Sequence, residues 1–151
     1  MHYRFIEESD FEELATLEKR LIPGKPDSYY RCQPTALRFF ARSGHSFVAA
    51  NELGIQGFVL AQAIWQGDRA TVLVTRIASN DNATYKGLLN ALIKSAYDAN
   101  AYEVALLVAQ KDRGDLYLAA KNSGFASSGL ELLVRILGSR GENGQTTGVF
   151  E

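Results

Sequence analysis

The chain has 151 residues, of which 46% are hydrophobic, so it can bury one sizeable core and is too short for two ordinary domains. Lys and Arg number 16 against 17 for Asp and Glu, and this balance argues against a nucleic-acid partner. The single cysteine, Cys32, cannot form an internal disulfide, and neither a secretion signal nor a bilayer-spanning apolar run is present. We therefore expect a single-domain cytoplasmic protein, over residues 1–151, with no membrane partner.

The first third of the chain predicts a strand and two helices. Residues 3–6 alternate enough for a strand, and Ser9 with Glu12 three residues later forms a capping-box pattern that predicts a helix start. The buried stripe of that helix consists of Phe11, Leu14, Leu17 and Leu21. Residues 23–28 predict a loop, and Pro34 suits the first turn of a second helix that ends at Gly44.

The middle of the chain predicts an antiparallel meander. Residues 46–50 and 54–65 are apolar strand-like runs joined by turn-forming residues 51–53, and residues 66–68 turn into a third run at 71–77. The polar residues 79–82 then predict a helix cap. From Ala83 onward, apolar residues recur at three-and-four spacing, which indicates a long helix with one buried face.

The last third predicts one more crossover. Residues 102–108 read as a strand that a helical connection makes parallel to the run at 71–77. A helix over about residues 112–122, a strand at 130–137 and a short strand near Val149 follow. These elements predict an α/β (α+β) fold with a mixed central sheet of about seven strands and four helices. The free edges of such a sheet also permit a homodimer.

The junction between the strand at 71–77 and the following helix is the part of the chain with most functional promise. A helix N-terminus has backbone N–H groups without intrahelical partners, and these groups attract anions. We therefore expect that a phosphate-bearing ligand can bind there. The alternative is that residues 79–82 only cap and solvate the helix, because Asn and Asp are ordinary cap residues.

The order of elements resembles the GNAT N-acetyltransferase superfamily over nearly the whole chain. The resemblance lies in residues 3–11 (YRFIEESDF), the hairpin through Gly57 and Phe58, the strand-to-helix unit at 71–99, and the helix that ends at Gly124 and Phe125. The chain is more closely similar to a small bacterial family of unknown function within that fold. That similarity lies in residues 37–42 (LRFFAR), 44–47 (GHSF), 61–63 (AQA), 65–67 (WQG), 72–77 (VLVTRI), 94–99 (KSAYDA) and 137–141 (LGSRG).

The resemblance implies a GNAT-like acyl-CoA N-acyltransferase fold with a site for acetyl-coenzyme A. The pantetheine arm would pair with the backbone of Val74, Thr75 and Arg76. The pyrophosphate would lie on the N–H groups that open the helix at Ala83, with help from Asn82, Thr84 and Lys86. The acceptor would be a small-molecule or peptide amine.

Two positions depart from the superfamily pattern. The pyrophosphate loop of the superfamily has Gly at one position and Gly or Ala two residues later, where this chain has Ala83 and Tyr85, and Asp81 would repel a diphosphate. The tyrosine that would protonate the departing thiolate aligns with Ala120. Tyr117 lies one helical turn earlier, so it is our candidate catalytic residue, although a structural aromatic would give the same pattern.

Four further side chains need an account at the sequence level. A general base would come from Glu103, from His45 or from water, since the strand at 71–77 contains no carboxylate. Arg76 lies in an apolar strand, so it should pair with a carboxylate, face solvent or contact an anionic ligand. Cys32 has no Cys or His at ligand spacing, so no metal site is expected.

The leading hypothesis is an acyl-CoA-dependent N-acetyltransferase that transfers the acetyl group directly to an unidentified amine. The competing hypothesis is a GNAT-fold protein that has lost transfer chemistry and acts as a ligand-binding or protein-interaction module. The residues Ala83, Tyr85 and Ala120 favour the second hypothesis. The strand at 71–77 with its helix cap keeps the first one open.

Overall fold

The computed structural model describes residues 1–22, 32–108, 114–135 and 137. Within them, one five-stranded sheet has the strand order β1-β2-β3-β4-β5. Neighbouring strands are antiparallel from β1 to β4, and β5 pairs parallel with β4, so the predicted mixed sheet is confirmed. The strands are β1 (His2–Phe5), β2 (Phe47–Asn51), β3 (Gly54–Gln66), β4 (Arg69–Ser79) and β5 (Glu103–Leu106).

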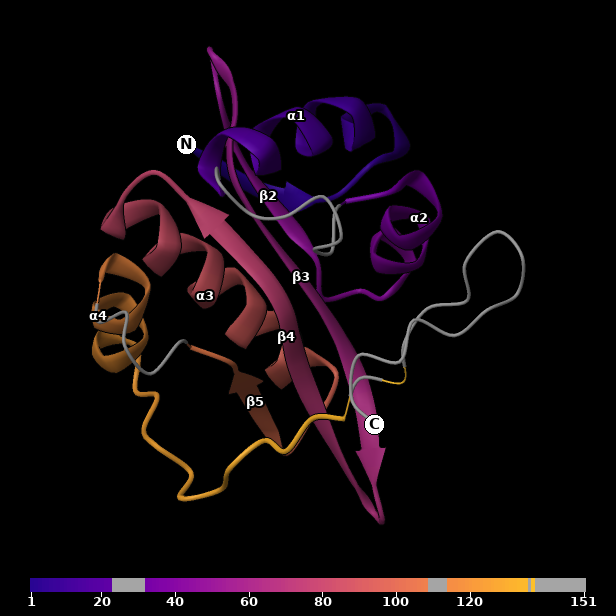
Figure 1. The fold of residues 1–151 in the computed structure, drawn as a ribbon, viewed down its shortest axis with the longest axis vertical. Helices are drawn as coiled ribbons and strands as arrows, with labels where there is room; N and C mark the ends of the chain where they lie inside the picture. Colours follow the sequence, from indigo (N-terminus) through magenta and orange to yellow (C-terminus); the bar gives the residue numbers. More distant parts are fainter. Residues whose placement is uncertain (23–31, 109–113, 136, 138–151) are drawn as a thin grey trace.

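The helices lie on both sides of this sheet (Figure 1). A short 3₁₀ turn, η1 (Glu8–Asp10), leads into α1, and α2 begins with Pro34 at its first turn as predicted. The α-helices are α1 (Phe11–Leu21), α2 (Pro34–Arg42), α3 (Asn82–Asp98) and α4 (Asp115–Asn122). The described helices include none with the length and apolar character needed to cross a membrane.

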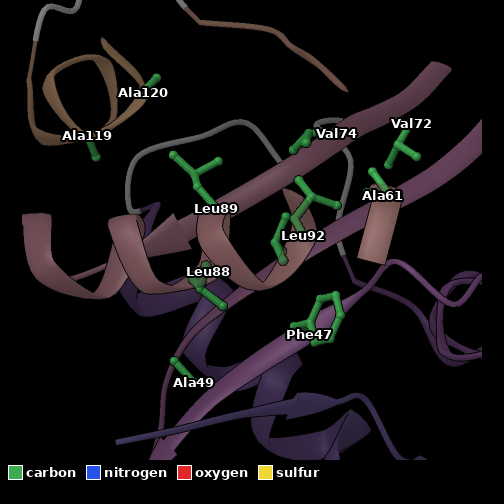
Figure 2. Packing of buried hydrophobic residues seen from close by; sticks show 12 residues of the cluster. Phe47, Ala49, Ala61, Val72, Val74, Leu88, Leu89, Leu92, Ala119 and Ala120 are labelled. Atoms are coloured by element: carbon green, nitrogen blue, oxygen red, sulfur yellow. The ribbon is translucent and has the colours of Figure 1, made fainter. Parts of the chain in front are cut away.

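Alternating residues of the strands build a separate core on each face of the sheet. Val59 and Ala61 of β3 pack with α3 and α4, whereas Phe58 and Leu60 pack with α1 and α2. This alternation follows from the two-residue period of a strand. The core on the α3 side contains Phe47, Ala49, Val72, Val74, Leu88, Leu89, Leu92, Ala119 and Ala120 (Figure 2).

Two glycines allow α3 to approach the sheet closely. A Cβ atom at Gly87 of α3 would lie 2.0 Å from Cζ of Tyr3, and one at Gly57 of β3 would lie 2.9 Å from the Ala78 carbonyl oxygen and close to Cγ2 of Thr84. Real Cβ atoms are not found so near other atoms, so these two positions require glycine unless the neighbours shift. The first turns of α3 are thereby fixed against β1 and β3.

The predicted cap of the first helix is wrong. Ser9 lies inside η1, and α1 begins at Phe11 with Asp10 as its N-cap residue. Asp10 accepts two hydrogen bonds from the Arg4 guanidinium, at 2.8 and 2.9 Å, and one from the Glu7 N–H at 2.9 Å. The side chain of Asp10 makes no cap hydrogen bond to α1; with Glu7 it forms a reciprocal capping box around η1, so the chain enters α1 through this 3₁₀ turn and not through a serine cap.

The predicted count of about seven strands is also wrong for the described residues, which contain five. Residues 130–135 and 137 form no strand, and Leu130, Leu132, Leu133, Val134 and Leu137 are exposed. Gly129 has φ +74° and the Leu130 N–H donates to Ser128 Oγ, so the chain turns just before this apolar run. Strand propensity alone does not make a strand without a paired neighbour. The expected strand near Val149 lies outside the described residues.

Candidate coenzyme groove at the β4 bulge

The central feature of the candidate site is a bulge in β4. Leu60 of β3 pairs with Arg76, and the next residue, Ala61, pairs with Val74. Thr75 is therefore an extra residue in β4, and its hydroxyl donates to the Leu60 carbonyl at 3.2 Å. A bulge of this kind bends its strand and increases the local twist.

The bulge coincides with the point where β5 leaves β4. The parallel pairing runs only from Thr71 to Val74 of β4, although β4 continues to Ser79. Among the described residues, no strand pairs with β4 on that side beyond Val74. The backbone N–H and C=O groups of residues 75–79 that face this side form an edge that an extended ligand can pair with. Of the predicted contacts of the pantetheine arm, Thr75 and Arg76 lie at the start of this edge, whereas Val74 still pairs with Leu106 of β5.

The N-terminus of α3 follows directly, as predicted, but its first cap position is already used. Asp81 is the N-cap residue, and its carboxylate accepts from the Thr84 N–H at 2.7 Å. The Asp81 N–H in turn donates to Ser79 Oγ at 3.3 Å. An anion that approaches this helix end therefore meets a carboxylate bonded to one of the N–H groups that it would use.

The other predicted phosphate contacts differ in position. Ala83 and Lys86 are exposed on the first turns of α3, whereas Thr84 is buried with its methyl group near Gly57. Asn82 donates from its side-chain amide to the Asp115 carbonyl at 3.1 Å. The structure thus leaves Ala83 and Lys86 accessible, buries Thr84, and uses the Asn82 side chain to join α3 to α4.

The hydrogen bond from Asn82 to the Asp115 carbonyl joins the first turns of α3 and α4. Tyr117 lies in the first turn of α4. Tyr117 is half-buried, and Ala120, one turn later, belongs to the core on the α3 side. Tyr85 is half-buried as well and packs against the same core. Tyr85 therefore places an aromatic side chain at a position where the superfamily pattern has Gly or Ala.

The two side chains considered as bases have different surroundings. Glu103 is exposed and accepts from the Thr71 hydroxyl at 2.9 Å. His45 is buried, with Nδ1 2.9 Å from Ser95 Oγ, and its burial lowers the pKa of its imidazole. Because Ser95 donates its only hydroxyl proton to the Leu92 carbonyl, His45 Nδ1 must donate to Ser95.

Of the three surroundings considered for Arg76, the structure shows a carboxylate partner. Its guanidinium lies 2.5 Å from Glu18 Oε2 of α1, and the two side chains are only 13% and 1% exposed. Glu18 was not predicted from the sequence as a residue of this region. A signal for it exists, because Glu18 follows Leu14 by four residues and precedes Leu21 by three, on the buried stripe of its helix.

Cys32 belongs to the same buried group. Its N–H and thiol donate to Glu18 at 2.9 and 3.0 Å. Burial, together with the adjacent Glu18 carboxylate, raises the pKa of the Cys32 thiol far above its ordinary value, so the thiol stays protonated and is a poor nucleophile. In the part of the chain that the structure describes, no three His, Cys, Asp or Glu side chains gather as a metal site.

A shallow hollow of about 400 Å³ lies elsewhere, over α2. Its described lining consists of Thr35, Arg38, Phe39, Arg42 and Ser43. None of these residues belongs to β4, α3 or α4, so this hollow is separate from the groove at the bulge.

Comparison with known proteins supports both the fold and a narrower family. A family model described as "Protein of unknown function (DUF1999)" matches residues 1–149. The chain belongs to the DUF1999 family. Its relative TTHA1254 from Thermus thermophilus has a crystal structure with 46% sequence identity and a TM-score of 0.78, covering 93% of this chain and 100% of that one.

More distant structures show the GNAT acetyltransferase fold. The structure of AAC(6')-Iy with the bisubstrate analog CoA-S-monomethyl-acetylneamine matches with a TM-score of 0.72 at 18% identity, covering 89% of this chain and 97% of that one. A ribosomal-protein-alanine N-acetyltransferase from Brucella melitensis matches with a TM-score of 0.67 at 14% identity, covering 90% and 100%. No curated protein matches. This DUF1999 member therefore has the GNAT fold.

Proposed function

We propose that this DUF1999 protein is an acyl-CoA-dependent N-acetyltransferase, built as one GNAT-like domain over residues 1–151. The observation that carries the proposal is the bulge at Thr75, where β4 loses its pairing with β5 and continues to the start of α3 with no strand of the described residues beside it. The complex of AAC(6')-Iy with a coenzyme A-derived analog, in the same fold, supports acetyl-coenzyme A as the cosubstrate.

The residues of the groove fit the pantetheine arm better than the diphosphate. The open edge of β4 offers backbone donors and acceptors to the amide groups of the arm. The exposed Lys86 and the first N–H groups of α3 favour the diphosphate, whereas the Asp81 carboxylate opposes it. Binding of the diphosphate would therefore require Asp81 to rotate away from the Thr84 N–H.

When bound, acetyl-coenzyme A would supply an activated acetyl thioester. The backbone N–H groups at the bulge would hold the carbonyl oxygen and stabilise the negative charge that develops on it. A neutral amine, from a small molecule or a peptide, would attack the carbonyl carbon directly, and water would take the amine proton, because Glu103 pairs with Thr71, three residues before Val74 and the bulge. Tyr117 would donate a proton to the leaving thiolate.

The second candidate function is a ligand-binding or protein-interaction module without transfer chemistry. The Asp81 carboxylate at the start of α3 and the half-buried Tyr85 favour it, because both reduce the space and the positive field for a diphosphate. Retained coenzyme binding without acetyl transfer to any amine would support this candidate.

Calorimetric titration with acetyl-coenzyme A and coenzyme A tests the proposal, together with the variants Tyr85→Gly and Asn90→Gly. Asn90 is exposed on α3, so its replacement by glycine controls for the loss of helix propensity. Micromolar binding by the wild type supports the proposal and justifies a screen of amines for release of free thiol. No binding at millimolar ligand refutes it, and binding gained only in Tyr85→Gly means that this side chain closes the site.

Two accompanying predictions concern the state of the protein. We expect a cytoplasmic location, and we expect that the free sheet edge and the exposed apolar side chains of Leu130, Leu132, Leu133 and Val134 permit a homodimer. Sedimentation equilibrium measures the second prediction: a single monomeric species up to about 100 μM, well above a typical stable-dimer dissociation constant, would contradict it.

A further inference from the structure

Three separate parts of the chain meet at one buried carboxylate, Glu18. Its two oxygens accept from the Cys32 N–H, from the Cys32 thiol and from the Arg76 guanidinium. Glu18 lies on α1, Cys32 lies just before α2, and Arg76 lies on β4. An ionised group that is 1% exposed is costly unless its bonding capacity is filled, and here three donors fill it.

The cluster lies at the bulge and on the opposite face of the sheet from α3. Arg76 is the residue that directly follows the extra residue Thr75. Its side chain reaches α1, whereas the neighbouring Val74 and Ile77 pack in the core on the α3 side. The contact of the Thr75 hydroxyl with the Leu60 carbonyl and the contact of the Arg76 guanidinium with Glu18 therefore both hold the bulge.

We propose that Glu18 is a positioning residue for the coenzyme groove, which acts through Arg76 to fix the direction of the β4 backbone beyond the bulge. This inference rests on the proposed function, since the groove is the open edge of residues 75–79. Glu18 itself does not line that edge, because its contacts with the strand run through the Arg76 side chain. Without the carboxylate, the guanidinium would lose its tie to α1, and β4 beyond Val74 would be held less firmly in a single orientation.

Glu13 provides a control on the same helix, at an exposed position. Its Oε1 accepts from the Ile55 N–H of β3 at 2.8 Å, so it also ties α1 to the sheet through a carboxylate, but away from the bulge. Replacement by glutamine removes the charge and keeps the shape at either position. The pair Glu18→Gln and Glu13→Gln therefore separates loss of an α1–sheet tie from loss of the tie to the bulge.

The test measures three quantities for each variant: the midpoint of thermal unfolding, hydrogen exchange of the peptide that covers residues 74–79, and the dissociation constant for coenzyme A well below the unfolding midpoint. For Glu18→Gln we expect at least tenfold faster exchange of residues 74–79 and at least tenfold weaker coenzyme A binding. For Glu13→Gln we expect both quantities within about twofold of the wild type, a difference too small to count as a lost contact. Arg76→Lys, which keeps the positive charge but not the planar guanidinium, should give an intermediate result and replaces Glu18→Gln if that variant fails to fold.

The inference is overturned if Glu18→Gln lowers the unfolding midpoint but leaves exchange of residues 74–79 and coenzyme A affinity the same as in Glu13→Gln. Glu18 would then be a structural tie only. The exchange measurement needs no ligand, so it decides the link from Glu18 to the bulge even if the wild type binds no coenzyme A. Absence of wild-type binding refutes the proposed function, and unchanged exchange refutes the positioning role.

Discussion

The contact between Tyr3 and Gly87 gives the sharpest prediction about stability. A Cβ atom at Gly87 would lie 2.0, 2.1 and 2.5 Å from Cζ, Oη and Cε1 of Tyr3, so Gly87→Ala forces the ring to move. Such overpacking costs about 1–3 kcal/mol, whereas replacing a helical glycine by alanine gains about 1 kcal/mol. We therefore expect Gly87→Ala to destabilise the wild type by about 0–2 kcal/mol.

The sign reverses when the ring is absent. In a Tyr3→Ala background all three contacting atoms are gone, so Gly87→Ala should stabilise by about 1 kcal/mol. The coupling energy between the two positions is then about 1–3 kcal/mol. Urea unfolding of the four proteins of this double-mutant cycle, with slopes compared to verify two-state behaviour, measures it. Additive effects, with a coupling energy below about 0.5 kcal/mol, would show that Tyr3 does not hold the first turns of α3 in place.

Three further predictions concern charged groups. Burial alone would raise the pKa of Asp10, but the hydrogen bonds from Arg4 and from a backbone N–H outweigh burial and lower that pKa. The stabilising effect of Asp10 is therefore present above about pH 4 and is lost as pH falls further. Asp10→Asn should cost about 1–2 kcal/mol at pH 7 by urea unfolding and should reduce the loss of stability at acid pH. Burial lowers the pKa of His45, so the folded state loses stability as pH falls below about 6.5, and in thermal scans between pH 5 and 7 His45→Gln should reduce this dependence. The first assignment would be contradicted if Asp10→Asn left the loss of stability at acid pH unchanged. The second would be contradicted if His45→Gln left the dependence of stability on pH between 5 and 7 unchanged. Asp81→Ser keeps a cap acceptor but removes the charge, and calorimetry should show about tenfold tighter coenzyme A binding, whereas unchanged affinity would contradict repulsion by Asp81.

Local sequence patterns predicted the elements whose formation depends on near neighbours. The turn residues between β2 and β3 form the expected hairpin, where the Leu53 N–H donates to the Asn51 side chain at 2.9 Å. Leu88, Leu89 and Leu92 of α3 are fully buried, as their spacing indicated. The N-cap residue Asp81 makes a local contact as well, and it lies within residues 79–82, where the cap was predicted.

Features that depend on distant contacts were not predicted. The bulge at Thr75 arises from the pairing register with β3, and nothing in residues 71–77 marks it. The Glu18–Arg76 pair joins residues 58 positions apart. The run at 130–137 had the composition of a strand, but strand formation depends on a partner that periodicity does not reveal. For Arg76 the sequence allowed a carboxylate partner, solvent or an anionic ligand, and only the structure shows the carboxylate.

The most direct test of the central claim is a titration of isotope-labelled protein with coenzyme A, followed by backbone amide NMR shifts. If the open edge of β4 is the coenzyme groove, the largest shifts should fall on residues 74–79 and on the first turn of α3, with smaller ones on α4. Tyr117 should respond through its ring signals when acetyl-coenzyme A replaces coenzyme A. Saturable shifts confined to other surfaces, such as the hollow over α2, or no shifts at millimolar ligand, would contradict the account.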